Sequence, residues 1–149
     1  MQDPVRSLHH AVALDPHFYV DSDTYKFEQD IILGSGWQVV APVSLITDVG
    51  DIIARQVGGR PIFIVRSQGG ALNGFYNICP HRAGPIATCD ARGLKRLRCA
   101  YHGWAYDFDG QLTAAPEMKD ADGFNTKAVR LSKIHVREWQ GLVWVSLDP

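Results

Sequence analysis

The sequence has 149 residues, of which 46% are hydrophobic and 21% are charged, and its net charge is -1. These values are typical of one folded domain with enough chain to bury a core without disulfide bonds. Its 15 basic and 16 acidic residues argue against a nucleic-acid or membrane-surface partner, because such partners select a basic excess. We also find no apolar run of the ~20 residues that a membrane span needs, and no apolar core of a secretory signal near the start.

Residues 1–36 predict a loosely structured arm followed by a short helix. The helix signature is the stretch SDTYKFEQDIILGSG, which begins at residue 22. Ser22 or Asp23 is expected to cap its first turn. Gly34 and Gly36 are expected to end it, because glycine accepts the left-handed conformation of a C-terminal cap.

Residues 37–149 predict a mainly β domain, an antiparallel sandwich or barrel, because short β-prone runs alternate with turn residues. We expect strands near residues 37–42, 51–57, 61–67, 72–78, 94–99, 104–108, 129–139 and 142–148, with hairpin turns at 57–60, 68–70 and 109–110. The stretch from 79 to 93 is long and irregular by comparison. Loops longer than about 12 residues in a compact β domain usually carry function.

Two short Cys/His pairs lie in and after this irregular stretch. Cys79 and His81 are two residues apart, Cys99 and His102 are three apart, and 17 residues separate His81 from Cys99. The three cysteines of the chain cannot all pair, so without an export signal we interpret them as reduced thiols or metal ligands in a cytoplasmic protein. Two thiolates and two imidazoles suit either one tetrahedral zinc or a two-iron cluster with both cysteines on one iron.

The residues around the two pairs favour the two-iron cluster. Pro80 and Pro85 stiffen the first loop, while Gly84 and Gly103 keep side-chain bulk low. Backbone N–H groups can then approach the sulfides and donate hydrogen bonds to them. Trp104 directly follows the second loop and is expected to shield the site from water, which a structural zinc site does not require.

At these residues the chain resembles a known family: CPHR followed by CAYHGW resembles the Rieske [2Fe–2S] signature. The resemblance implies that Cys79 and Cys99 bind one iron and that His81 and His102 bind the other. Neutral imidazole ligands raise the reduction potential of such clusters to roughly −150 to +300 mV. We expect the low end of this range, because high-potential members have an extra cysteine in each loop, joined as a disulfide, and a serine where this chain has Trp104.

The immediate surroundings of the four ligands are expected to comprise Arg82, Tyr101, Gly103 and Trp104. Arg82 lies beside His81 and can pair with a carboxylate across an interface. A basic group precedes Cys99 and is interpreted either as a solvated strand face or as a docking patch for an acidic electron donor: Arg92, Lys95, Arg96 and Arg98. Cys89 falls outside the pattern and is interpreted as a passenger residue in a loop, with a redox-active or partner thiol as the alternative.

The remaining histidines are not expected to bind metal. His9 and His10 are adjacent and point in different directions on most backbones. His17, in DPHFYVD, is interpreted as a packed or surface residue. His135 alternates with apolar residues, which predicts a position on the polar face of a strand.

A longer resemblance covers nearly the whole chain, from Leu14 to Pro149. LDPHFYVDSDTYKFEQDIILGSGWQVV, PIFIVRSQGGALNGFYNICPHRAG and the closing GLVWVSLDP resemble the entry to the large (α) subunit of Rieske non-haem iron ring-hydroxylating oxygenases. This resemblance implies a Rieske-type antiparallel β sandwich with an inserted cluster-binding subdomain and a short N-terminal helix. Residues 37–149 would be the Rieske domain, with cluster-binding loops at about 79–104.

Oxygen activation requires an open iron site, such as two histidines and one carboxylate. The sequence shows no spaced histidine pair with a nearby carboxylate on a helix. In the family, a mononuclear Fe(II) lies in a catalytic domain that follows where this sequence stops. We therefore expect a Rieske-domain fragment of an oxygenase α subunit or one component of a split protein.

The resemblance also implies partners. An NAD(P)H-dependent reductase, or a ferredoxin, would supply single electrons, and a catalytic oxygenase domain, in a neighbouring subunit of a trimer, would use them with dioxygen to hydroxylate an organic substrate. His81 and His102 would lie on the side of the cluster from which electrons leave. The alternatives are a self-standing Rieske ferredoxin-like carrier and a zinc-stabilised binding module. Neither the substrate nor the choice between dioxygenase and monooxygenase can be read from these residues.

Overall fold

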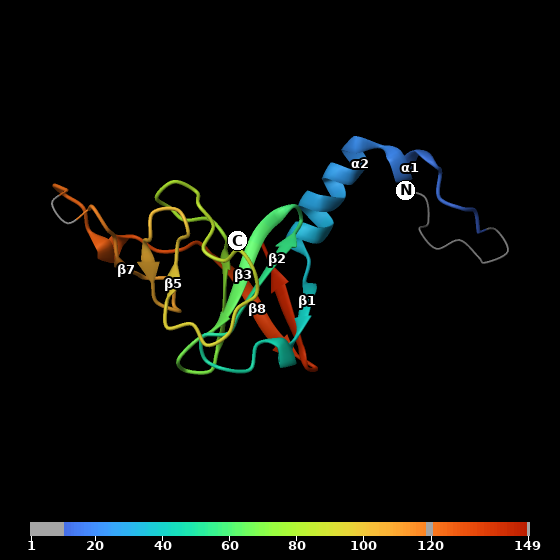
Figure 1. The fold of residues 1–149 in the computed structure, drawn as a ribbon. Helices are drawn as coiled ribbons and strands as arrows, with labels where there is room; N and C mark the ends of the chain where they lie inside the picture. The colour runs from blue at the N-terminus through green and yellow to red at the C-terminus, as the bar shows by residue number, and fades with distance from the viewer. Residues whose placement is uncertain (1–10, 119–120, 149) are drawn as a thin grey trace.

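The computed structural model describes residues 11–118 and 121–148, so the expectations for His9 and His10 lie outside the described residues. The described part is mainly β, as predicted, with a six-stranded antiparallel sheet in the order β1-β9-β8-β4-β3-β2 and a three-stranded sheet in the order β5-β6-β7 (Figure 1). The strands are β1 (Gln38–Pro42), β2 (Ile52–Val57), β3 (Arg60–Arg66), β4 (Leu72–Tyr76), β5 (Leu97–Arg98), β6 (Ala105–Tyr106), β7 (Leu112–Ala114), β8 (Lys133–Trp139) and β9 (Leu142–Ser146). Two 3-10 turns, Val43–Leu45 and Thr126–Ala128, complete the elements outside the N-terminal region.

Eight of these strands were predicted, and the turns at 57–60, 68–70 and 109–110 connect strands as expected. Strand β7 was missed. Of its three residues only Leu112 is buried, so no alternating pattern marks it in the sequence. Its existence follows from the Asp109-Gly110 turn, which returns the chain antiparallel to β6.

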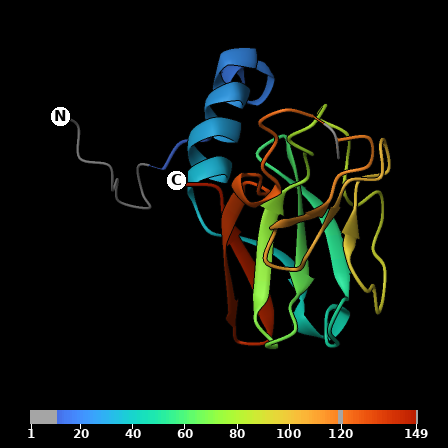
Figure 2. The same ribbon diagram turned by 90° about the vertical axis from the view of Figure 1, so that its left-hand side faces the viewer.

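The large sheet curls so that its two ends approach each other, and Figure 2 shows its strands running side by side. The Arg55 side chain on β2 donates a 3.2 Å hydrogen bond from Nε to the carbonyl of Val40 on β1. The concave side encloses one apolar core, formed by Ala41, Ile46, Ile53, Val57, Ile62, Ile64, Val143, Val145 and Leu147.

A second core lies on the convex side of β2, β3 and β4. Phe63 and Phe75 stand opposite each other there, with ring centroids 5.3 Å apart. The segment that carries the Cys/His pairs packs onto them through Cys79, Ile86, Ala87, Leu97, Cys99, Trp104, Tyr106 and Phe108. Strand β3 is therefore buried on both faces, which explains why Ile62–Val65 is a continuous apolar run rather than an alternating one.

The N-terminal region is helical from residue 17. It comprises α1 (His17–Val20), α2 (Ser22–Phe27) and a π-helical continuation, η2 (Glu28–Leu33). The expected arm thus contains one helical turn, α1. The predicted caps Ser22 and Asp23 were wrong by one or two residues, because Asp21 has extended backbone angles and its carboxylate accepts the Thr24 N–H at 2.7 Å.

The predicted reason for glycine at the end of this helix was also wrong. Gly34 has φ -74°, which is right-handed rather than left-handed. A Cβ at Gly34 would lie 2.9 Å from Nη1 of Arg60, and a Cβ at Gly36 would lie 2.7 Å from the Ile32 carbonyl oxygen. At Gly36 the carbonyl of the preceding helical turn therefore leaves no room for a side chain, whereas at Gly34 the closest atom is the end of a flexible arginine side chain. The helix projects beyond the sheet from this point (Figures 1 and 2).

Gly50 binds the segment that precedes Cys99 through a backbone hydrogen bond with Leu94. It has φ +84°, and its carbonyl accepts the Leu94 N–H at 2.9 Å. A side chain at this position would collide with the Leu94 backbone. Only glycine satisfies both constraints.

We predict that Gly50→Ala destabilises the chain by about 2 kcal/mol, because it combines an unfavourable positive φ with a backbone collision. The measurement is the midpoint of urea unfolding followed by circular dichroism. Gly69→Ala is the matched control, since Gly69 lies in a turn with nothing near its Cβ position. Equal midpoints for the two variants would contradict this account.

Candidate metal centre

Each Cys/His pair lies on a tight loop that closes on itself. In the first loop the Cys79 N–H donates to the Gly84 carbonyl at 2.9 Å, and the Ala83 N–H donates back to the Cys79 carbonyl at 2.9 Å. In the second loop the Cys99 N–H donates to the Trp104 carbonyl at 2.8 Å. The Gly103 N–H donates back to the Cys99 carbonyl at 3.1 Å, so paired backbone hydrogen bonds close both loops.

The two loops meet, although 20 positions separate the two cysteines in the sequence. The Ala100 N–H donates to the Pro85 carbonyl at 3.2 Å. A Cβ at Gly84 would lie 2.8 Å from the Tyr101 Cβ atom and 3.1 Å from the Cys99 Sγ atom, so a side chain there would collide with the opposite loop. The expected small-residue role of Gly84 therefore has a specific cause, which is contact with the opposite loop.

The four predicted ligands form an inner pair and an outer pair. Cys79 and Cys99 are 1% and 3% exposed and belong to the apolar core on the convex side of the sheet. His81 and His102 are half-buried, with ring centroids 4.6 Å apart. No three His, Cys, Asp or Glu side chains in the described part of the chain are arranged around one metal position.

Aromatic rings hold the two imidazoles in place. Trp104 is buried and stacks on His81, with centroids 4.6 Å apart and planes 7° apart. Tyr101 is exposed and stacks on His102, with centroids 4.1 Å apart. Phe124 meets the far side of Trp104 edge-on at 5.5 Å. Phe124 was missed by sequence reasoning, because the segment around it has no periodic pattern.

Tyr106 is a second residue that sequence reasoning missed. Its hydroxyl lies 3.1 Å from the Cys79 Sγ atom, and its ring is fully buried. Burial, and then the neighbouring Cys79 thiol, raise the pKa of Tyr106 far above its usual range, so the hydroxyl keeps its proton. Trp104 and Tyr106 are two residues apart on one predicted strand, and that spacing indicates a shared face.

The inner pair is suited to a cationic partner. Burial raises the pKa of the Cys79 thiol, and the adjacent Cys99 adds to this, while the Tyr106 hydroxyl and the His81 backbone N–H oppose it. A bound metal ion would supply the positive charge that two buried thiolates need.

The outer pair also has a free ligand atom. Nδ1 of His81 is buried and has no hydrogen-bond partner in the described part of the chain. Burial, and then the nearby His102 and Arg82, lower the pKa of His81 and favour the neutral ring. A neutral imidazole with an unpaired, inward-facing nitrogen is the form that ligates metal. The residues present therefore fit an iron–sulfur group of the predicted kind.

Two polar residues from the sheet anchor the chain between the loops. The buried Asn77 side chain accepts the N–H groups of Ile86 and Ala87 at 2.8 and 3.0 Å and donates to the Ala87 carbonyl at 2.6 Å. Asp51, 1% exposed, accepts the Gly93 N–H at 3.1 Å and an Arg92 N–H at 2.9 Å.

These anchors change the interpretation of the predicted basic group. Arg92 is exposed, as the interpretation of the group as a solvated face expects, and it also pairs with Asp51. Lys95, Arg96 and Arg98 are exposed, and no carboxylate among the described residues pairs with them.

The other sequence-predicted residues lie at the surface. Cys89 is an exposed free thiol in the irregular segment, and Arg82 is exposed next to His81. His17 is exposed and lies 3.7 Å from the Asp21 carboxylate. His135 is exposed on β8 between half-buried apolar residues, which confirms its predicted position on the polar face of a strand.

A β fold in which two loops, each with one cysteine and one histidine ligand, lie side by side indicates a metal-binding protein. Comparison with known proteins narrows the class further. The family model for the Rieske [2Fe-2S] domain matches residues 36–135. The chain therefore belongs to the Rieske [2Fe–2S] domain family, and its cofactor is a [2Fe–2S] cluster of the Rieske type rather than zinc.

Similar proteins of known function are oxygenase subunits. The chain is 28% identical over 139 residues to the carnitine monooxygenase oxygenase subunit of Escherichia coli K12, covering 93% of this chain and 37% of that subunit. It is 33% identical over 140 residues to the benzene 1,2-dioxygenase subunit alpha of Pseudomonas putida, covering 93% of this chain and 31% of that subunit.

A solved structure supports the fold assignment. The apo form of a quaternary ammonium Rieske monooxygenase superposes with a TM-score of 0.82 at 30% identity, covering 89% of this chain and 38% of that one. The chain thus spans about a third of the length of the oxygenase subunits that it matches. Within the described residues, no helix is long and apolar enough to cross a bilayer.

The anchor at Asp51 makes stability depend on pH. Burial alone would raise the pKa of Asp51, but hydrogen bonds from the Asp48 and Gly93 N–H groups and from Arg92 lower it below 3.8. Its stabilising contribution is therefore complete above pH 3.8 and is lost as the pH falls through the lower folded-state pKa.

We predict that Asp51→Asn lowers the free energy of unfolding at pH 7 by about 1–3 kcal/mol, because the amide cannot replace all the hydrogen bonds that the carboxylate accepts. The deficit should shrink when urea unfolding is repeated at pH values below 3.8. Asp122→Asn, at an exposed position, serves as the control. A deficit that stays constant down to the lowest pH would refute the assigned role of the charge.

Proposed function

We propose that Cys79 and Cys99 ligate one iron of the [2Fe–2S] group and that His81 and His102 ligate the other. The observation that carries this proposal is the meeting of the two loops, with buried sulfurs inside and an unpaired buried Nδ1 on His81. When bound, the group supplies reversible one-electron redox chemistry at a potential of roughly −150 mV or above.

We propose further that the chain acts as the electron-transfer domain of an oxygenase in the cytoplasm. Single electrons would come from an NAD(P)H-dependent reductase or a ferredoxin and would leave toward a mononuclear iron that uses dioxygen to hydroxylate an organic substrate. That iron would belong to a catalytic domain outside this chain, in a neighbouring subunit of a trimer. The similarity to oxygenase subunits supports this function over that of a self-standing carrier.

In this proposal residues 37–149 form the electron-transfer domain and residues 1–36 form an arm and helix. Tyr106 keeps its proton and donates its hydrogen bond to the ligating sulfur of Cys79. Trp104 fixes the plane of His81 and excludes water from that face. The half-buried imidazoles lie on the solvent side of the site, so we assign the electron exit to them.

We predict that His102→Cys removes or transforms the low-average-g electron paramagnetic resonance signal of the dithionite-reduced protein, because a thiolate replaces an imidazole on one iron. The visible absorption spectrum should change with it. His135→Cys, at an exposed site on β8, should leave both spectra as in the parent protein. An unaltered signal in His102→Cys would rule out the ligand assignment.

We predict that Tyr106→Phe lowers the reduction potential while the cluster remains bound. The lost hydrogen bond stabilised the more negative, reduced state, and about 1.4 kcal/mol of such stabilisation corresponds to about 59 mV for one electron. The measurement is a redox titration followed by visible absorption. Tyr76→Phe is the control, because the Tyr76 hydroxyl contacts the Leu147 carbonyl rather than a predicted ligand. A higher or unchanged potential in Tyr106→Phe would contradict the assigned direction.

A further inference from the structure

A tight turn after β7 holds Glu117 in a backbone conformation that side chains disfavour. The Met118 N–H donates to the Ala115 carbonyl at 3.3 Å, with Pro116 and Glu117 between them. Because proline has a negative φ and Glu117 has φ +67°, this is a type II turn, whose third residue is usually glycine or asparagine. A carboxylate therefore occupies a position where the fold itself favours glycine.

Two other non-glycine residues have positive φ in the part of the chain that the structure describes, and each has a local cause. Gln140 lies in the two-residue turn between β8 and β9, where the twist of a hairpin selects positive φ. Ala83 lies in the first ligand loop, and its N–H closes that loop on the Cys79 carbonyl. Strained residues of this kind gather at functional sites, so the position of Glu117 relative to the ligands becomes the question.

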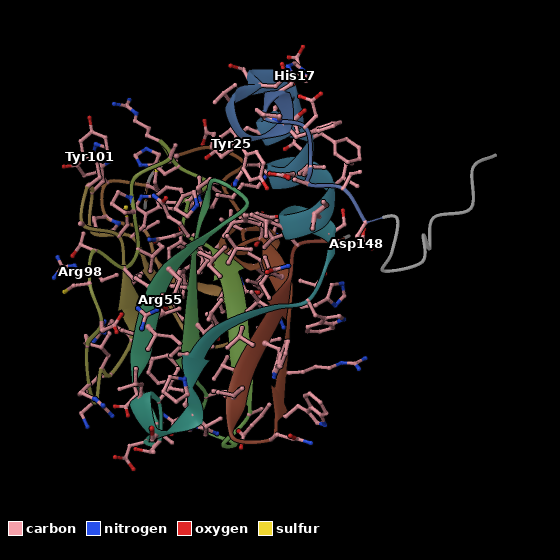
Figure 3. The ribbon with its side chains drawn as sticks, turned by 90° about the vertical axis from the view of Figure 1, so that its right-hand side faces the viewer. His17, Tyr25, Arg55, Arg98, Tyr101 and Asp148 are labelled. Atoms are coloured by element: carbon pink, nitrogen blue, oxygen red, sulfur yellow. The ribbon has the colours of Figure 1, made fainter. Side chains whose placement is uncertain are left out.

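The turn places Glu117 beside the outer pair of predicted ligands. Pro116 and Glu117 line a cavity of about 530 Å³ whose opposite wall is the second ligand loop, His102 included. Tyr101, which stacks on His102, lines the same cavity. In Figure 3, Tyr101 lies at an edge of the molecule away from the helical segment that carries His17. Glu117 thus reaches the site from a segment outside both ligand loops.

The charge of Glu117 acts on both imidazoles of the site. Glu117 shares the cavity with His102, and within the described residues no cation forms an ion pair with it. Its field also reaches His81: burial, and then His102 and Arg82, lower the pKa of that ring, whereas the Glu117 carboxylate opposes them. A negative charge that favours a proton on an imidazole also disfavours an added electron on the metal beside it.

We propose that the Glu117 carboxylate holds the reduction potential of the cluster low, an inference that rests on the proposed function. Reduction adds one electron, and with it one negative charge, on the side of the site where His81 and His102 lie. The carboxylate repels that charge and favours the oxidised state, since the charge around such clusters helps to set their potentials. The reduced state is then a stronger one-electron donor to the next iron. This gives the expected low potential a cause outside the two ligand loops.

The central variant is Glu117→Gln, which removes the charge but keeps the length of the side chain and the strained turn. The cluster-containing protein is titrated at pH 7 with dithionite, which supplies the electron through mediator dyes, and visible absorption gives the potential. We expect the equilibrium constant for reduction to rise roughly threefold, which is about 28 mV at 59 mV per tenfold change. The difference should shrink at high salt, because Glu117 is exposed and its charge is screened.

Two further variants separate the charge from the fold. Glu117→Gly removes the charge and accepts the positive φ, so it should raise the potential as Glu117→Gln does without lowering the midpoint of urea unfolding. Glu28→Gln removes one exposed carboxylate from η2, on the helix that projects beyond the sheet, and should leave the potential unchanged. The visible spectrum of each variant checks that the cluster is bound.

The outcomes separate this inference from the proposed function. A parent chain that binds no cluster overturns both. A parent chain with a normal cluster, in which Glu117→Gln has the same potential as Glu28→Gln or a lower potential than the parent, overturns the role of Glu117 alone. A Glu117→Gly variant that loses stability and keeps the parent potential shows a structural role and also overturns it. A rise confined to the two Glu117 variants and reduced by salt supports it.

Discussion

The packing of Cys79 and Cys99 into the apolar core beneath the two loops is the constraint on which the rest of the site depends. These sulfurs share their core with Phe63 and Phe75, which project from the convex face of the large sheet. The sheet therefore helps to position the inner half of the site. Burial also raises the pKa of the Cys79 thiol, so its thiolate form needs a nearby positive charge. Folding and metal binding are thus coupled through the charge of two buried sulfurs.

The strands and the ligand pairs could be predicted from the sequence because each is a local pattern. Alternating β runs, glycine turns and the Cys/His spacings all fall within a few residues of one another. The contacts that assemble the site are not local. Asp51 and Arg92 lie 41 positions apart, and Phe124 reaches Trp104 from a segment without regular pattern. No periodicity in one sequence reveals such partners.

The helix end shows a correct position predicted for a wrong reason. Glycine was expected at residues 34 and 36 for a left-handed backbone, yet Gly34 is right-handed, and a Cβ at Gly36 would collide with the Ile32 carbonyl oxygen. Capping rules based on backbone handedness do not describe this contact with the preceding helical turn. Gly84 is also limited by space, since a Cβ there would lie 2.8 Å from the Tyr101 Cβ atom and 3.1 Å from the Cys99 Sγ atom.

The same long-range pairing separates the arginines that bind carboxylates within the fold from those that do not. Arg55 and Arg92 come from different segments, yet both end on carboxylates that fix the chain between the ligand loops. Arg96 has the same chemistry and lies four residues from Arg92, but no described carboxylate faces it. Residue type and spacing are therefore insufficient to assign a basic cluster to folding or to recognition. Only the position of the partner carboxylates in the folded chain shows which arginines stabilise the fold.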